Sequence, residues 1–167
     1  GQTSAVFNEV DRHVLQMRGK ATAFLSDAGA ETYERTRLDQ LAVESVLVAS
    51  GLAEGFDLAS GQRIAFYLPN DYRTTVWIEA AKRLDVPYVA IASGAASTSL
   101  GDRVADTSAT ILVSTEDLIP VAQQALETIT PPPIAVVMPP SSKAIEGWHL
   151  VTDVLLQAKE RLLQASM

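Results

Sequence analysis

The stretch Arg63-Ile64-Ala65-Phe66-Tyr67-Leu68-Pro69 decides the fold class of this 167-residue chain. Its apolar residues follow one another without polar alternation, which predicts a strand buried on both faces, and the proline ends that strand. Three more short apolar runs follow, at residues 86–92, 110–114 and 134–138. Segments with apolar residues at helical spacing separate these runs. The sequence therefore predicts an α/β fold: a mostly parallel, doubly wound sheet with helices on both faces.

Capping signals and apolar spacing predict the helices. Asn70 or Asp71 is placed to cap a helix that runs to Leu84, and Ser97 or Thr98 is placed to cap the next one.

Three further helices are predicted at residues 34–50, 117–129 and 152–165. Gly51 is placed to end the first of them. Pro120 falls in the first turn of the second, where proline is tolerated.

Residues 21–33 predict a β-hairpin on the N-terminal side of the sheet. Two short runs flank Asp27-Ala28-Gly29, and these residues are typical of a hairpin turn. The segment Asp11-Arg12-His13 precedes the hairpin, and we expect it to pin the N-terminal residues to the body. No internal repeat is visible, so residues 1–167 are expected to form a single domain.

The composition excludes several function classes. A net charge of −7 opposes nonspecific binding to nucleic acid or to an anionic membrane. The longest apolar run is far shorter than the roughly 20 residues that span a bilayer. The chain has no cysteine, which removes disulfides, thiolate catalysis and cysteine-based metal sites and favours a cytoplasmic location.

Motifs for common chemistries are missing from the sequence. It contains no G-x-x-x-x-G-K-[ST] phosphate loop, no G-x-G-x-x-G after the first buried strand and no G-x-S-x-G nucleophile elbow. The two histidines, His13 and His149, do not stand at metal-ligand spacing. We therefore assign no catalytic residue and no metal ligand.

One loop, Ala92-Ser93-Gly94-Ala95-Ala96-Ser97-Thr98, is a candidate binding site because it follows a predicted strand and opens a helix. Ligands of open parallel sheets bind outside the carboxyl ends of the strands, and a helix N-terminus attracts anions. Two interpretations stay open, a ligand loop or an ordinary tight turn with a good cap. Arg103, which neighbours Asp102 and Asp106, is likewise either part of a structural ion pair or an anion contact.

The order of these segments resembles AMP-forming acyl-CoA synthetases of the acetyl- and propionyl-CoA type. The resemblance is an ordered series, with nearly unbroken spacing between Pro69 and Ser114, rather than one diagnostic motif. The matching segments are Asn8 with Asp11-Arg12-His13 (N-x-x-D-R-H), Thr32-Tyr33, Gly61–Pro69 (G-D-R-V-A-I-Y-M-P), Glu79–Leu84, Ser93-Gly94 (the G-G of F-G-G-F-S), Leu100–Asp106 (A-L-x-D-R-I-x-D), Thr110–Ser114 and Trp148-His149.

The resemblance implies a parent enzyme that converts a carboxylate, ATP and CoA to acyl-CoA, AMP and pyrophosphate, with Mg accompanying the ATP. The acyl group would be short, of the propionyl or 3-hydroxypropionyl type. Ser93 and Gly94 are the best candidates for a pantetheine or adenine contact, and Arg103 is a further one. The family's phosphate loop, adenine site and catalytic lysine would lie beyond Met167.

This chain is therefore expected to be the N-terminal portion of a synthetase, catalytically incomplete by itself and without a tightly bound cofactor. Its expected partner is the remainder of the synthetase chain, and homo-oligomerisation stays open. The sequence also departs from the family, because Ile119 and Ala122 stand where the CoA-phosphate arginines are expected. The alternative is a noncatalytic α/β module with a structural or interaction role. A free-standing nucleotide-binding domain is opposed by the missing glycine-rich fingerprints.

Overall fold

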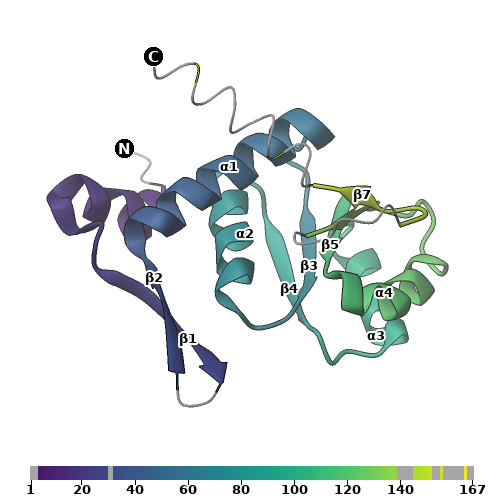
Figure 1. Ribbon diagram of the computed structural model, residues 1–167. Coiled ribbons are helices and arrows are strands. Elements are labelled where there is room, and N and C mark those ends of the chain that lie inside the picture. The colour runs from purple at the N-terminus through teal and green to yellow at the C-terminus, as the bar shows by residue number, and fades with distance from the viewer. Residues whose placement is uncertain (1–3, 30–31, 139–144, 152–154, 156–163, 165–167) are drawn as a thin grey trace.

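The computed structural model describes residues 4–29, 32–138 and 145–151, together with Leu155 and Gln164. A five-stranded parallel sheet forms its centre, in the order β4-β3-β5-β6-β7 (Figure 1). The strands are β3 (Ile64–Leu68), β4 (Tyr88–Ala92), β5 (Ile111–Ser114), β6 (Ile134–Val137) and β7 (His149–Leu150). The predicted α/β fold class is confirmed, and among the strands of this sheet only the two-residue β7 was not predicted. The helical segments Phe7–Asp11 and Val14–Arg18, which precede the hairpin, were also not predicted.

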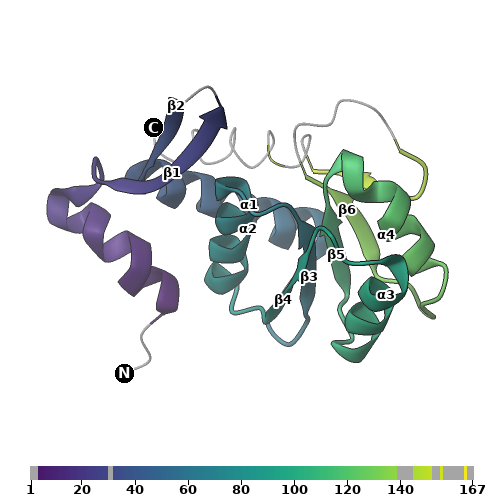
Figure 2. The ribbon, with the colours of Figure 1, turned by 90° about the horizontal axis from the view of Figure 1, so that it is seen from below.

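Helices cover both faces of the sheet, as Figure 2 shows. On one face lie α1 (Leu38–Phe56) and α2 (Tyr72–Arg83), and on the other α3 (Ser97–Asp106) and α4 (Ile119–Leu126). Successive residues of β3 alternate between the two layers, because Phe66 packs on the α1 and α2 side and Tyr67 on the α3 and α4 side. Both residues are 1% exposed, so β3 is the buried centre of the fold.

The predicted hairpin is present, as β1 (Thr22–Gly29) and β2 (Thr32–Arg37), and it projects from the body of the molecule in Figure 1. Its turn was placed too early, because Asp27 pairs with Tyr33 inside the ladder. The helix predicted to begin at residue 34 was also placed too early. Residues 34–37 belong to β2 instead.

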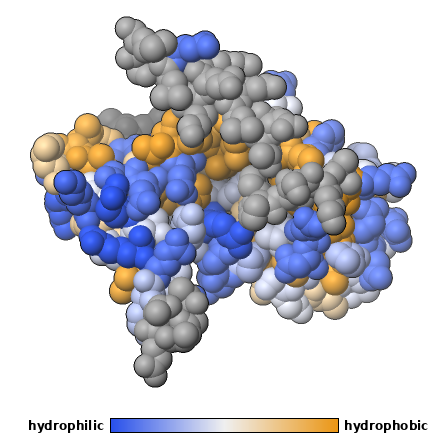
Figure 3. Space-filling view, in the orientation of Figure 1, coloured by the Kyte–Doolittle hydropathy of each residue, from blue (hydrophilic) through white to orange (hydrophobic). Residues whose placement is uncertain are grey.

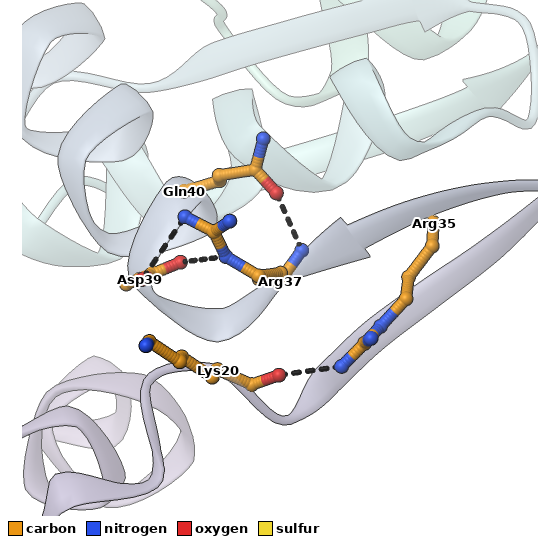
Figure 4. A network of polar contacts seen from close by, with 5 residues as sticks. All are labelled: Lys20, Arg35, Arg37, Asp39 and Gln40. Atoms are coloured by element: carbon orange, nitrogen blue, oxygen red, sulfur yellow. Dashed lines mark hydrogen bonds and ion pairs between the residues drawn. The ribbon is translucent and has the colours of Figure 1, made fainter.

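Polar contacts at Arg37 explain where α1 begins (Figure 4). The Arg37 backbone N–H donates to Gln40 Oε1 at 2.8 Å, which satisfies a group that the helix itself leaves without a partner. The Arg37 guanidinium also pairs with Asp39, with Nε and Oδ1 2.8 Å apart. The predicted end at Gly51 is wrong, because α1 continues to Phe56 and ends at Asp57 in the left-handed conformation, with φ 52°.

Some predicted details of the other elements are confirmed and others are wrong. Asp71 caps α2 as predicted, since its Oδ1 accepts from the Thr74 N–H at 3.2 Å. Neither Ser97 nor Thr98 caps α3, because Ala96 occupies that position without a side-chain hydrogen bond.

The fourth predicted helix begins as a short 3₁₀ turn, Glu116–Leu118, and continues as α4 with Pro120 in its first turn. The predicted loop at 139–147 and helix at 152–165 lie mostly outside the described residues. No helix in the described ranges combines the length and apolar character that crossing a membrane requires.

The strand β4 differs most from its prediction. It was expected to be buried on both faces, yet Tyr88, Ala90 and Ala92 are exposed and only Ile91 is buried. The reason is its place at the edge of the sheet, where β3 is its single neighbour.

Candidate functional site

The strand order reverses between β3 and β5. From β3 the chain crosses to β4 on one side, and from β4 it crosses back to β5 on the other side. In open α/β sheets the crevice at the carboxyl ends of such a pair of strands is the common place for a ligand. The loops that follow β3 and β5 are therefore the first place to look for a site.

A cavity of about 660 Å³ lies at this position. It is lined by residues that follow three neighbouring strands, namely Pro69, Asp71, Arg73, Thr115, Glu116, Asp117 and Met138. This lining includes three carboxylates and one guanidinium. Arg73 is itself engaged, because its Nη2 and Nε donate to Asp71 Oδ2 at 2.6 Å and 3.0 Å. The excess of negative charge in this crevice opposes a highly anionic ligand such as a nucleoside triphosphate.

Two hydroxyl side chains at the end of β5 differ in their partners. Ser114 is fully buried, and its Oγ donates to the Tyr67 carbonyl oxygen of β3 at 3.1 Å. Thr115 is 7% exposed, and its buried Oγ1 has no hydrogen-bond partner among the described residues. A buried hydroxyl without a partner costs stability, so Thr115, which lines the crevice, lowers the stability of the fold there.

The sequence-predicted residues Ser93 and Gly94 lie in a turn at the carboxyl end of β4. The Tyr67 hydroxyl reaches this turn from β3 and lies 2.9 Å from the Ser93 carbonyl oxygen and 3.0 Å from that of Ala95. The Ala95 N–H closes the turn by donating to the Ala92 carbonyl oxygen at 2.9 Å. Gly94 is exposed, and a side-chain carbon added to it would have no atom within 4 Å. The turn is thus held by hydrogen bonds on the side that faces β3 and is open to solvent at Gly94.

The third predicted residue, Arg103, is not brought to this turn. It lies six residues after Ser97, about 9 Å farther along the axis of α3. Its side chain is exposed and, within the described ranges, forms no ion pair with Asp102 or Asp106. Of the two interpretations of Arg103, the structural ion pair is therefore not formed among the residues that the structure describes.

Both histidines contact neighbouring side chains of the fold. His13 lies 3.4 Å from the Arg18 guanidinium, and the His149 ring packs edge-on against Phe56 with ring centres 5.7 Å apart. In the part of the chain that the structure describes, no three histidine or acidic side chains form a cluster that could hold a metal ion.

A larger cavity of about 820 Å³ lies at the amino end of β4, between the N-terminal residues Ser4 and Ala5 and the end of α2. Its two cations, Lys82 and Arg83, are already held by carboxylates of Glu79, Glu9 and Asp11. Despite its size, this cavity therefore offers a ligand no unpaired cation among its described lining residues.

Comparison with known proteins links the chain to acyl-CoA synthetases. Over 117 residues, 70% of the chain, it is 26% identical to an acetyl-coenzyme A synthetase of Paraburkholderia phymatum and 27% identical to those of Burkholderia mallei and Burkholderia thailandensis. The chain spans 18% of the length of each of these relatives. No protein-family model matches it. These similarities support an acyl-CoA synthetase-like family for the chain.

Proposed function

We propose that this chain is the N-terminal α/β portion of a longer AMP-forming acyl-CoA synthetase that acts on a short carboxylate of the propionate or 3-hydroxypropionate type. The parent reaction joins the carboxylate to AMP with release of pyrophosphate, and CoA then displaces AMP. ATP with Mg and CoA are its substrates. A cytoplasmic location is part of this proposal, because the reaction consumes ATP and CoA.

The observation that carries the proposal is the similarity over 117 residues, which make up 70% of the chain. Within the parent, this chain would supply a sheet edge and the turn that carries Ser93 and Gly94. The open surface above Gly94 suits a thin ligand segment such as pantetheine, since a side-chain carbon placed there would have no atom beyond its chain neighbours within 4 Å. Arg103 would contribute at most a distant cation.

Two measurements test the proposal. The natural reading frame should continue past Met167 into a Ser/Thr/Gly-rich loop that ends in Pro-Lys, and a frame without that loop would contradict a synthetase parent. For the chain itself, titration calorimetry with CoA and with an acyl-adenylate analogue should reveal which substrates this portion contacts. ATP turnover is not expected from these residues alone.

The crevice between β3 and β5 favours a second candidate, a noncatalytic module with a structural or interaction role. Its lining offers phosphates only one cation, Arg73, which is already paired with Asp71, and Ile119 and Ala122 offer no charge to CoA. Ala122 is fully buried in the α3 and α4 layer, so it serves the core. Clear binding of CoA by the chain would overturn this candidate.

A further inference from the structure

One side chain of the neighbouring strand β3, that of Tyr67, contacts the turn that carries Ser93 and Gly94. Tyr67 is 1% exposed, and its hydroxyl oxygen lies within hydrogen-bond distance of the Ser93 and Ala95 carbonyl oxygens, one on each side of Gly94. The hydroxyl has one hydrogen, which both carbonyls must share. A buried phenol needs such partners, so the turn and the tyrosine stabilise each other.

We infer that Tyr67 is a positioning residue that fixes the shape of the turn Ser93–Ala95. The inference rests on the proposed function, because holding the turn in one conformation matters only if the turn binds a ligand. A turn held in this way lets the ligand bind without first ordering the backbone. The carbonyl oxygens of Ser93 and Ala95 are occupied by the Tyr67 hydroxyl of β3. The surface left for a ligand is the backbone at Gly94, where the space is open.

The neighbouring strand provides a matched control. The Ser114 hydroxyl also makes one buried hydrogen bond to Tyr67, but to its backbone carbonyl oxygen at 3.1 Å, and it does not contact the turn. Ser114→Ala therefore removes a hydrogen bond of the same kind close by, whereas Tyr67→Phe removes the bonds that reach the turn and keeps the aromatic ring in the core.

Hydrogen exchange of single amides measures the attachment directly. The Ala95 amide closes the turn by donating to Ala92, and the Leu100 amide donates to Ala96, the residue that caps α3. In Tyr67→Phe, the exchange rate of Ala95 relative to Leu100 should rise roughly five-fold, the factor that corresponds to one ordinary hydrogen bond. In Ser114→Ala this ratio should stay at the wild-type value, even where overall stability falls. An unchanged ratio in Tyr67→Phe would overturn the inference.

CoA binding separates this inference from the proposed function. Calorimetry should give weaker CoA binding for Tyr67→Phe and for Gly94→Ala, the first because the turn is loosened and the second because a methyl group narrows the open surface. Gly94→Ala should leave the Ala95 exchange ratio unchanged, since its side chain meets nothing within 4 Å. If wild-type chain does not bind CoA while the exchange ratio rises in Tyr67→Phe, the positioning role stands and the assignment of the turn to CoA is wrong.

Discussion

Arg83, the last residue of α2, holds Asp11 of the N-terminal segment through two hydrogen bonds. Nη1 donates to Oδ2 at 2.8 Å and Nη2 to Oδ1 at 2.7 Å. Its Nε donates to Ser45 Oγ of α1 at 2.9 Å. One guanidinium thus connects the N-terminal segment, α1 and α2, and confirms the expectation that the segment around Asp11 is pinned to the body.

We predict that Asp11→Ala lowers the free energy of unfolding by about 1–3 kcal/mol, because the substitution leaves the Arg83 guanidinium largely buried without its carboxylate. Urea unfolding followed by the fluorescence of the two tryptophans, Trp77 and Trp148, measures this loss. Arg12→Ala is the matched control, since Arg12 contacts Asn8 on the exposed surface and its removal should cost less than about 0.5 kcal/mol. Equal losses in the two variants would contradict a specific role for Asp11.

A second prediction concerns Lys82, which donates to Glu79 Oε1 at 2.8 Å and to the Glu9 carboxylate. Glu79 is 5% exposed, so Lys82→Met should leave a buried carboxylate without a cation and cost about 3 kcal/mol of stability. The double variant Lys82→Met/Glu79→Met should recover much of that loss. A double variant as unstable as the single one would show that packing, rather than charge, accounts for the effect.

The pH dependence of Lys82 follows from the same contacts. Burial alone lowers the pKa of Lys82, but its hydrogen bonds to Glu79 and Glu9 outweigh burial and raise the pKa above 10.5. The folded state therefore holds this proton more tightly than the unfolded state, and the stability gained is complete below pH 10.5 and lost at higher pH.

The buried strands could be predicted from local sequence because burial on both faces leaves an unbroken apolar run. Prediction and structure agree within two residues for β3, β5 and β6. The exposure of β4 could not be predicted, since it depends on strand order rather than on the composition of β4 itself. The start of α1 also depended on a distant partner, because pairing with β1 extends β2 through residues where helix was expected.

The candidate site was predictable only in part for the same reason. Ser93 and Gly94 follow a strand in the sequence, and the structure places them at its carboxyl end. The crevice lined by Asp71, Arg73 and Thr115 could be predicted only if the strand order were known, with β3 between β4 and β5. The available signal was that polar residues follow two separate apolar runs.

Another prediction concerns the apolar surface of α1, which Figure 3 shows as an orange band along the helix. Val43 on this helix is 60% exposed. Val43→Lys should leave the free energy of unfolding within about 0.5 kcal/mol of wild type, because an exposed side chain contributes little to the core. Val48→Lys, at a position that is 5% exposed, should by contrast prevent stable folding. Comparable stability of the two variants would contradict the orientation of α1.

The close approach of α3 and α4 at Gly101 gives a prediction about packing. A side-chain carbon on Gly101 would lie 3.0 Å from Thr128 Oγ1 and 3.5 Å from the Ala125 carbonyl oxygen. Gly101→Leu should therefore cost at least about 1–3 kcal/mol through overpacking. Combining Gly101→Ala with Thr128→Ala should restore space, and the better helix propensity of alanine, worth up to about 1 kcal/mol, should offset the loss of the hydrogen bond from Thr128 Oγ1 to the Ala125 carbonyl oxygen at 2.8 Å. Thermal unfolding should therefore give a stability near wild type for the double variant and a clear loss for Gly101→Leu, and a stable leucine variant would contradict the tight contact.

The last prediction concerns alkaline unfolding and Tyr67. Burial raises the pKa of the Tyr67 hydroxyl above its usual value of 10.0. The unfolded chain therefore loses this proton at lower pH than the folded chain, and stability should fall as the pH rises above 10. Over that range Tyr67→Phe should reduce the downward slope of unfolding free energy by up to about 1.4 kcal/mol per pH unit. Tyr33→Phe is the control, since its side chain is 70% exposed, and it should keep the wild-type slope. Urea midpoints measured between pH 9 and pH 11.5 give these slopes, and an equal slope for Tyr67→Phe and wild type would show that Tyr67 ionises as readily in the fold as in the unfolded chain.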